Sequence, residues 1–388
     1  MIKGSMAKWF LLKSAITASG SHASTAFVSR AASSVAVAAA TQTNFPSSPS
    51  APISSRKSFR NHSTNRGNTS LFESMRTGYY RNTNSDEISL EKLLEKAASV
   101  LSTTPPNALE NLNDRERLFF SSSYDASGSK DDENNMTTRG FSNWIVPGKI
   151  MVGQYPGRVP ETNTPTEEEV RQHLRNVLFH PVGETANSKD ICFVSLQSEL
   201  PPQDDHDSWK KNNGEIYLDP SSRMEWPNPF SHYAPMAESV LQDQGSGSDQ
   251  PKNVSVRYIH HPIQDLSVPS NSKKMKLLLW KILDFLDSGE NKDSMVYVHC
   301  WGGRGRAGLT ACCLLTLLEF ASSTNTDRKP MDVRAIFDVV QTGYGSRLGS
   351  ENMPEALSRS PQTESQRAFV NRFYQEVEEE ARMRASRE

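Results

Sequence analysis

The chain has 388 residues, a formal net charge of −2 and only four cysteines, two of them adjacent at Cys312 and Cys313. So few cysteines exclude the disulfide-stapled frameworks of small secreted proteins and indicate a reducing compartment. The hydrophobic share of 36% is below that of a fully globular chain, which predicts that part of the sequence has no core of its own.

The N-terminal residues 1–72 contain no Asp or Glu, and Ser, Thr and Ala dominate them. Such a disordered, basic leader is typical of a transit peptide for a plastid or mitochondrion, and a merely disordered tail on a cytoplasmic protein is the alternative. The apolar run Trp9–Leu12 is too short to span a bilayer. The charged residues of this leader are all basic: Lys3, Lys8, Lys13, Arg30, Arg56, Lys57, Arg60 and Arg66.

Without these eight positive charges, the net charge of −2 becomes about −10 for the rest of the chain. An acidic body argues against nonspecific binding to nucleic acid or to anionic membranes. The sequence leaves the oligomeric state open.

Residues 73–140 are expected to form a linker with one amphipathic helix. Apolar residues recur at helical spacing from Ile88 to Leu101, and Ser85 is the expected N-cap. This helix serves either to bind a partner or as a strut against the next domain, and the strut is favoured. The polar run from Ser121 to Thr138 is interpreted as linker.

Residues 141–388 are expected to form one domain. Two apolar runs between Trp144 and Gly157, separated by Pro147-Gly148, predict either a hairpin or a strand and turn. Acids follow Thr166 in the first turn of a predicted helix, and a central strand is expected at Ile191–Leu196.

Residues 199–250 are polar, contain several prolines and show no clear period, so they are interpreted as an inserted surface loop. The cluster Asp204–Asp207, which includes His206, has the residue types of a metal site. Clustered acids with one His more often form a solvated turn, and the turn is favoured here.

The remaining elements alternate between strands and helices. Strands are expected at Val254–Ile259 and Met295–Val298, and an apolar helix follows Thr310. Alternation of this kind predicts an α/β fold with a central, mostly parallel sheet flanked by helices and a site at the carboxyl ends of the strands. Further helices are expected at Ser272–Leu286, Met331–Val340 and Gln362–Arg382.

The junction between the Met295 strand and the following helix carries the chemistry. Backbone N–H groups at a helix start favour an anion, and glycines allow those amides to turn inward. Cys300 lies where a thiolate nucleophile is favoured, and the planar fork of Arg306 can hold two phosphoryl oxygens. The expected phosphate-binding residues are Trp301, Gly302, Gly303, Arg304, Gly305 and Arg306.

The motif His299-Cys300-x-x-Gly303-x-x-Arg306 resembles the active-site loop of the cysteine-dependent protein tyrosine and dual-specificity phosphatases. The resemblance implies a three-layer phosphatase fold, a phosphocysteine intermediate on Cys300, phosphate binding by Arg306 and a supporting role for His299. The implied chemistry requires no metal or cofactor. A buried structural Cys in a glycine turn is the alternative.

Two further stretches resemble family segments. The stretch His260–Pro269 is similar to the loop that carries the general acid, with Asp265 in the place of the acid, 35 residues before Cys300. Alternatively, Asp265 only shapes a turn or caps the next helix.

The stretch Gln362-Thr363-x-x-Gln366 is similar to the segment that positions the hydrolytic water. Since glutamines four apart share a helical face, both side chains are expected at one site. The alternative is a solvated first helical turn with Thr363 or Glu364 near an N-cap.

Within the superfamily, the chain looks most like the kinase-associated dual-specificity phosphatases and their bacterial and algal relatives, over about Phe141 to Tyr374. It departs from the family at Ala307, where most members have a Ser or Thr that steadies the departing thiolate. Slower hydrolysis of the intermediate is therefore expected.

Three functions follow from this resemblance. The first is a phosphatase acting on phosphotyrosine or phosphoserine/threonine proteins. The second is a phosphatase of a phosphoinositide, phosphatidylglycerol phosphate or phosphoglucan, which the extra cation Arg304 would suit. The third is a catalytically weak phosphate-binding module, which Ala307 keeps open.

Overall fold

The computed structural model describes residues 88–105, 107–126, 138–161, 163–180, 188–218, 228–243, 253–287, 293–323, 328–352 and 358–387. The predicted transit peptide of residues 1–72 and the predicted N-cap Ser85 lie outside these ranges.

The centre of the fold is a five-stranded sheet with the strand order β3-β4-β9-β5-β8. Strands β4, β9, β5 and β8 run parallel, and β3 is an antiparallel edge strand that forms the predicted hairpin with β4. Every residue of the central strand β9 is buried, as expected for a parallel strand covered on both faces. The strands are β3 (Ser142–Val146), β4 (Ile150–Gly153), β5 (Ser188–Gln197), β8 (Asn253–Ile263) and β9 (Met295–His299).

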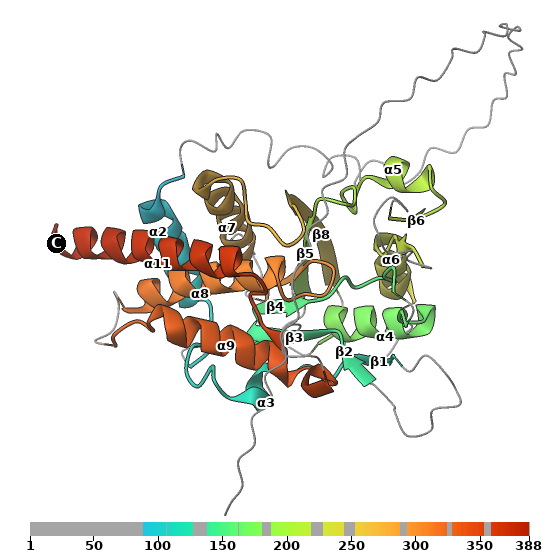
Figure 1. The fold of residues 1–388 in the computed structure, drawn as a ribbon, viewed down its shortest axis with the longest axis horizontal. Coiled ribbons are helices and arrows are strands. Elements are labelled where there is room, and N and C mark those ends of the chain that lie inside the picture. The colour runs from blue at the N-terminus through green and yellow to red at the C-terminus, as the bar shows by residue number, and fades with distance from the viewer. Residues whose placement is uncertain are drawn as a thin grey trace, which may run out of the picture. The chain divides into compact units, whose positions relative to one another are not determined.

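Helices cover both faces of this sheet, which confirms the layered α/β prediction. Figure 1 shows α7, α8, α9 and α11 on one side of the sheet and α4 and α6 on the other. Helix α8 is buried on all sides from Arg306 to Ala321, because it packs against strands on one side and helices on the others. The helices are α4 (Glu167–Leu178), α6 (Ala234–Gln242), α7 (Ser272–Asp287), α8 (Arg306–Ser323), α9 (Val333–Ser346) and α11 (Glu364–Ala385).

The predicted N-terminal helix is α2 (Leu90–Ser102), and it packs against α7, α8 and α11 as a strut. Its N-cap is Ser89, whose side chain accepts a hydrogen bond from the Lys92 amide at 3.2 Å. Lys96 also forms ion pairs with Asp284 at 3.1 Å and with Asp287 at 2.7 Å on α7. The strut interpretation, and not the partner-binding one, therefore describes the buried face of α2.

The segment before the domain contains further short elements. The short helix α3 (Arg115–Leu118) precedes two strands, β1 (Ser123–Asp125) and β2 (Thr138–Gly140), which pair antiparallel. The polar run Ser121–Thr138, expected to be linker, thus forms a strand near each end.

The prediction of a surface loop at residues 199–250 is wrong for the described part of this segment. It contains α5 (His206–Lys210), the strand pair β6 (Glu215–Ile216) and β7 (Phe230–Ser231), and α6. The side chains of Trp209, Phe230 and Tyr233 are fully buried. These aromatic residues are too widely spaced in the sequence to produce a period, yet the fold brings them into one core.

The acidic cluster at Asp204–Asp207 begins in a turn, as favoured from the sequence, but His206 and Asp207 are already the first residues of α5. Asp205 is the N-cap of α5, and its side chain accepts hydrogen bonds from the Ser208 amide at 3.1 Å and the Ser208 hydroxyl at 2.7 Å. Across the described residues, no group of three or more His, Cys, Asp or Glu side chains is arranged to hold a metal ion.

Several boundaries differ from the predictions. Strand β8 continues through Ile263, so the first part of the predicted acid loop is strand. Helix α9 extends to Ser346, beyond the predicted Val340, and a 3-10 turn follows at Ser350–Asn352. Among the described helices, none has both the length and the apolar composition needed to cross a bilayer.

Candidate active site

The candidate nucleophile lies at the carboxyl end of the central strand. Cys300 directly follows β9, is only 3% exposed, and is separated from the start of α8 by the loop Trp301–Gly305. Because β9 lies between β4 and β5, the loop opens at the sheet edge where the parallel strands end. This is the location that the sequence predicts.

The carbonyl groups of this loop point away from the predicted phosphate site. The carbonyl of Trp301 accepts from the Tyr155 amide at 2.8 Å, and that of Arg304 accepts from the Ser360 hydroxyl at 2.9 Å. Because a trans peptide places its C=O and N–H on opposite sides, the amides that follow these carbonyls face the other side of the loop. That arrangement is the one an oxyanion cradle needs.

Arg347 holds the carbonyls of Gly302 and Gly303, which lie between Trp301 and Arg304 in the loop. Its buried guanidinium donates to the carbonyls of Gly302 at 3.2 Å and Gly303 at 3.0 Å, and also to the carbonyl of Val152 and the side chain of Asn143. Burial lowers the pKa of Arg347, although the charge of a Cys300 thiolate opposes this shift. Sequence reasoning missed Arg347, because nothing in its neighbourhood marks it as part of the site.

Gly303 has the backbone geometry that this close approach requires. Its φ is +69°, and a Cβ at this position would lie 2.2 Å from the backbone of Gly153. Any other residue would therefore displace the loop from β4.

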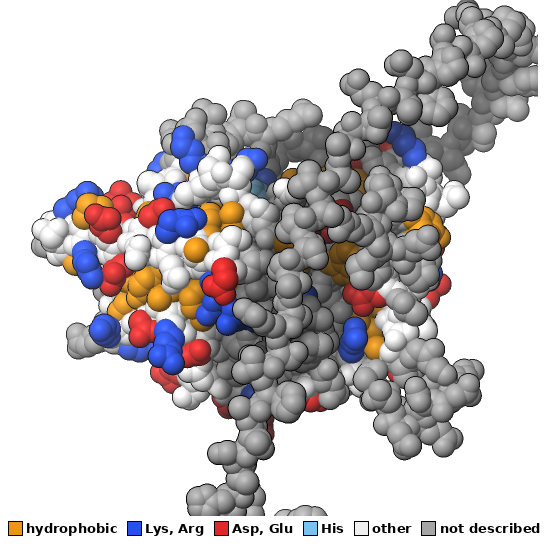
Figure 2. All heavy atoms as spheres, in the orientation of Figure 1, with side chains coloured by type: hydrophobic (Ala, Val, Ile, Leu, Met, Phe, Trp, Pro, Cys, Tyr) orange, Lys and Arg blue, Asp and Glu red, His pale blue; other side chains and the backbone are white. Residues whose placement is uncertain are grey.

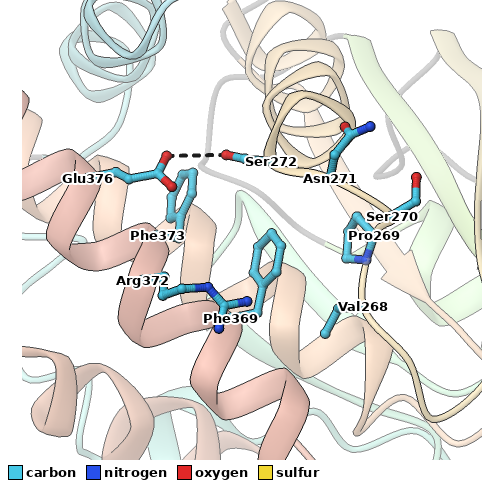
Figure 3. Close-up of a pocket in the computed structure, with 9 residues that line it drawn as sticks. All are labelled: Val268, Pro269, Ser270, Asn271, Ser272, Phe369, Arg372, Phe373 and Glu376. Atoms are coloured by element: carbon cyan, nitrogen blue, oxygen red, sulfur yellow. Dashed lines mark hydrogen bonds between the residues drawn. The ribbon is translucent and has the colours of Figure 1, made fainter.

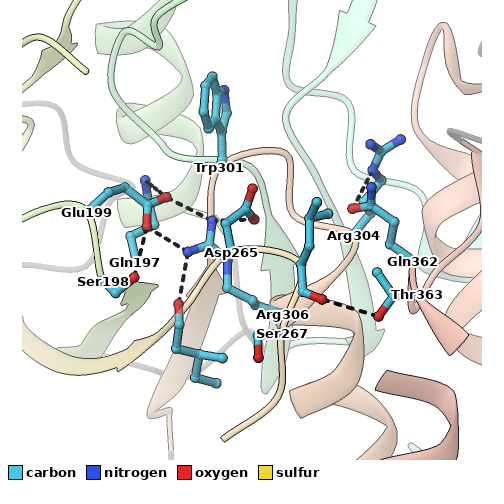
Figure 4. A network of polar contacts seen from close by, with 12 residues as sticks. Gln197, Ser198, Glu199, Asp265, Ser267, Trp301, Arg304, Arg306, Gln362 and Thr363 are labelled. Carbon is cyan, nitrogen blue, oxygen red and sulfur yellow. Dashed lines mark hydrogen bonds and ion pairs between the residues drawn. The ribbon is translucent and has the colours of Figure 1, made fainter. Parts of the chain in front are cut away.

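Arg306 lies under the loop with its side chain only 1% exposed. Its Nη1 and Nη2 donate to Glu199 Oε2 and Oε1, both at 2.8 Å, and Nη1 also donates to the Ile263 carbonyl at 3.1 Å. Burial alone would lower the pKa of Arg306, but the hydrogen bonds of Glu199 and the charge of Cys300 raise it above its ordinary value. The guanidinium is therefore a permanent cation that interacts electrostatically with Cys300. Figure 4 shows the guanidinium with its partners Glu199 and Asp265.

Glu199 is a second residue that sequence reasoning missed. Burial works to raise the pKa of its carboxyl group, but the hydrogen bonds and charge of Arg306 outweigh burial and lower it. The residue follows β5 at the same sheet edge as Cys300. Its position just after a central strand was the available signal, which the assignment of residue 199 to a surface insertion concealed.

The candidate acid Asp265 is at the site. Its Oδ1 lies 3.0 Å from Arg306 Nη2, and its side chain is 56% exposed (Figure 4). The next residue, Leu266, has a φ of 58°, a left-handed conformation that is unfavourable for a residue with a Cβ. The structure thus brings Cys300, Arg306 and Asp265 together.

His299 is buried beneath the loop. Its Nε2 lies 2.9 Å from the hydroxyl of Tyr233, which belongs to the segment 199–250. Burial lowers the pKa of His299 to about 3, so its imidazole is neutral at pH 7. A supporting position for His299 agrees with this contact.

The two glutamines lie on either side of the α11 N-cap, which is Thr363. Gln362 precedes the helix, and its Oε1 accepts from Arg304 Nε at 3.2 Å. Gln366 is fully buried and forms a capping box with Thr363. The expected shared helical face is therefore wrong, although a Cβ on Gly305 would lie 3.2 Å from both side chains.

Ala307 has no hydroxyl substitute one turn later. The Thr310 hydroxyl donates to the Arg306 carbonyl at 3.0 Å, within the helix.

The side chain of Trp301 in the loop is held by two contacts. Its indole donates to Glu161 Oε1 at 3.1 Å and packs edge-on against Phe230.

Residues 235–354, which include Asp265, Cys300 and Arg306, match the family described as PTP-SAK, Swiss Army Knife protein, DSP-PTPase phosphatase domain. This stretch is therefore similar to a dual-specificity phosphatase domain. Glu199 and both glutamines lie outside the matched stretch.

The phosphatase domain also resembles individual proteins. The chain is 33% identical over 88 residues to cyclin-dependent kinase inhibitor 3 of Mus musculus, which is 22% of this chain and 39% of that protein. Two proteins of invertebrate iridescent viruses are 36% and 35% identical over 63 and 60 residues. The chain thus matches at most 39% of the length of these relatives.

Solved structures similar to this chain include two phosphatases. One is Tk-PTP in its active form, with a TM-score of 0.31, 16% identity, and coverage of 60% of this chain and 96% of that chain. The other is kinase associated phosphatase with its catalytic site cysteine replaced by serine, with a TM-score of 0.34, 14% identity, and coverage of 63% and 98%.

Proposed function

We propose that this chain hydrolyses phosphate monoesters of phosphotyrosine or phosphoserine/threonine proteins through a phosphocysteine intermediate. The observation that carries the proposal is the buried guanidinium of Arg306, held beside Cys300 under a loop whose carbonyls are turned away. A tetrahedral dianion is the ligand that such a combination of amides and a planar cation favours.

The first step transfers the phosphoryl group to sulfur. The Cys300 thiolate attacks phosphorus, the S–P bond forms and the P–O bond to the leaving group breaks. Arg306 and the loop amides hold the equatorial oxygens as charge develops on them. Asp265 gives its proton to the leaving oxygen.

Binding of the substrate changes the partners of Arg306. Glu199 holds the guanidinium from one side through two hydrogen bonds, whereas Asp265 makes one contact and is more than half exposed. A phosphate group that binds Arg306 displaces the weaker partner, Asp265. The freed carboxylate takes up a proton from solvent and can then reach the leaving oxygen as an acid.

The second step returns the enzyme to its starting state. Water attacks phosphorus, the S–P bond breaks, inorganic phosphate leaves and Asp265 takes up a proton from the water. Gln362 is placed beside the loop through its contact with Arg304 and is the candidate to orient this water. Ala307 supplies no hydroxyl for the departing thiolate, so this step is expected to limit turnover.

Turnover of p-nitrophenyl phosphate by the intact, reduced protein tests the proposal. Cys300→Ser should reduce the rate to background while the protein still binds inorganic phosphate. Absence of turnover by the unmodified protein would contradict the proposal and favour the phosphate-binding module.

A nonprotein substrate is the second candidate. Half-buried Arg304 lies on the loop itself and is held by Gln362, which would suit a polyanionic ligand. Phosphate release from phosphopeptides, phosphoinositides, phosphatidylglycerol phosphate and phosphorylated amylopectin separates the two candidates. A kcat/KM highest for phosphopeptides supports the first, and one highest for a lipid or glucan supports the second.

The leader composition supports delivery to a plastid or mitochondrion by residues 1–72. Fusion of these residues to a fluorescent protein should direct it to an organelle. A diffuse cytoplasmic signal would contradict this assignment.

A further inference from the structure

The side chain of Gln366 makes three hydrogen bonds to backbone groups. Its Oε1 accepts hydrogen bonds from the amides of Gln362 and Thr363, both at 3.1 Å, and its Nε2 donates to the Ser267 carbonyl at 3.1 Å. Two N–H groups at one end and a carbonyl at the other fix which end of the amide is oxygen. Gln366 therefore joins the start of α11 to the loop that carries Asp265.

These contacts leave Gln366 poorly suited to orient a water nucleophile. A water that attacks phosphorus must direct a lone pair at it and give its hydrogens to an acceptor. Both lone pairs of Gln366 Oε1 are already used by backbone amides.

The Asp265 loop consists of residues 264–271, between β8 and α7. It contacts α11 through a few hydrogen bonds. The Thr363 hydroxyl lies 3.4 Å from the Leu266 carbonyl, and Ser272 at the far end of the segment donates to Glu376 at 3.2 Å (Figures 3 and 4). Between these ends, a cavity of about 220 Å³ separates residues 268–272 from the α11 residues Phe369 and Phe373 (Figure 3). The loop is thus not packed continuously against α11 along this stretch.

The strained residue of the loop lies next to the Gln366 contact. Leu266, at a φ of 58°, stands between Asp265 and Ser267. Such a conformation persists only where its surroundings enforce it. The Ser267 amide donates to the Gln264 carbonyl at 3.1 Å and closes a turn around Leu266, and α11 adds its contacts to the Leu266 and Ser267 carbonyls.

We propose that Gln366 is a positioning residue that latches the Asp265 loop to α11 and thereby aims the acid at the leaving group. This rests on the proposed phosphatase function and assigns Gln366 to the first chemical step. Loss of the latch lets Leu266 relax to a negative φ, which turns Asp265 away from the leaving group.

The substitution Gln366→Glu tests the latch with the least disturbance. Glu retains the oxygen of the capping box, but it replaces the donor to Ser267 by an oxygen that repels that carbonyl. The readout is kcat/KM for a series of aryl phosphates, since kcat/KM reports the steps up to departure of the first product. Weakly acidic leaving groups depend most on the general acid.

We expect the loss of kcat/KM to grow with the pKa of the leaving phenol. It should be about threefold or less for p-nitrophenyl phosphate and about 10- to 100-fold for phenyl phosphate, which does not exceed the roughly 10²–10⁴ that a general acid contributes. The loss of kcat/KM in Asp265→Asn, which removes the acid itself, sets the upper limit for the loss at each leaving group.

Three results would overturn the latch. One is an unchanged kcat/KM with a kcat below that of the unmodified protein, because slower hydrolysis of the phosphocysteine would place Gln366 in the water step. The others are an equal loss for every leaving group and no loss at all.

The matched control is Gln172→Glu on the exposed face of α4, where the amide donates to Asn176. It should leave every rate constant unchanged. Turnover by the unmodified protein and its loss in Cys300→Ser are measured first. Their failure would refute the proposed function, whereas their success with an unaltered Gln366→Glu series refutes only the latch.

A second pair of variants covers the case in which Gln366→Glu does not fold. Thr363→Ala removes the hydroxyl near the Leu266 carbonyl, and Thr363→Ser retains it. The latch predicts the same leaving-group dependence for Thr363→Ala and its rescue in Thr363→Ser. Identical series for the two variants would contradict it.

Discussion

Two carboxylates share Arg306, and they are held in different ways. Glu199 makes two hydrogen bonds of 2.8 Å and its side chain is 17% exposed, whereas Asp265 makes one contact of 3.0 Å and is 56% exposed. The buried pair fixes the plane of the guanidinium. The exposed partner is free to exchange with a substrate.

Replacement of the fixed partner should weaken substrate capture. In Glu199→Gln, the guanidinium loses a charged, bidentate acceptor and is no longer held in one plane. We expect kcat/KM for p-nitrophenyl phosphate to fall by about 10- to 100-fold, since a truncated buried charge pair typically costs about 2 kcal/mol or more. Steady-state kinetics at pH 7 measures the effect.

The control for this prediction is Glu215→Gln. Glu215 lies 3.8 Å from Arg158 on the surface and makes a similar but exposed ion pair. Exposed pairs contribute little, so its kinetics should match the unmodified protein. Equal kinetics in Glu199→Gln would show that Arg306 needs no such partner.

At the scale of elements, the strand-loop-helix unit at Cys300 could be predicted from the sequence. The apolar run before Cys300 and the unbroken apolar stretch after Arg306 both belong to elements buried on all sides, β9 and α8. Local composition was enough to predict these two elements, because both are buried on all sides and therefore consist of unbroken apolar runs. The same loop also carried the family motif.

Residues that join this unit to other elements could not be predicted. Arg347 lies at the C-cap of α9, 47 positions after Cys300, and Tyr233 contacts His299 from the segment 199–250. Their roles arise from contacts between distant parts of the chain. No local pattern distinguishes a buried arginine that holds carbonyls from one that faces solvent.

The hydrogen bonds that Arg347, at the end of α9, makes to the loop after Cys300 can be tested by a conservative substitution. Arg347→Lys keeps a cation but loses the planar fork that reaches Gly302, Gly303 and Val152 together. The loop carbonyls should then lose their orientation, and kcat/KM should fall by about tenfold or more. Steady-state kinetics with p-nitrophenyl phosphate measures the loss.

An exposed arginine provides the comparison for this brace. Arg359→Lys alters a residue that forms an exposed ion pair with Glu364 and should leave kcat/KM unchanged. If Arg347→Lys were as active as Arg359→Lys, the loop would not depend on the fork of Arg347.

At the scale of the whole molecule, the matched phosphatase segment 235–354 is only part of the folded body. Strands β3, β4 and β5 come before it, and α11 comes after it. Helix α2 adds buried leucines to the same core and contacts α7, α8 and α11. Helix α2 therefore contributes to the stability of the domain.

The contribution of α2 can be measured in the full chain. Leu93 is fully buried in the core, so Leu93→Ala should lower the free energy of unfolding by about 2–5 kcal/mol. Urea unfolding followed by circular dichroism reports this change, and kcat of the folded protein should stay constant. Glu95→Ala, on the exposed face of the same helix, should change stability by about 0.5 kcal/mol or less. Equal stability of the two variants would mean that α2 is dispensable for the fold, and the alternative of a helix that binds a partner would then regain support.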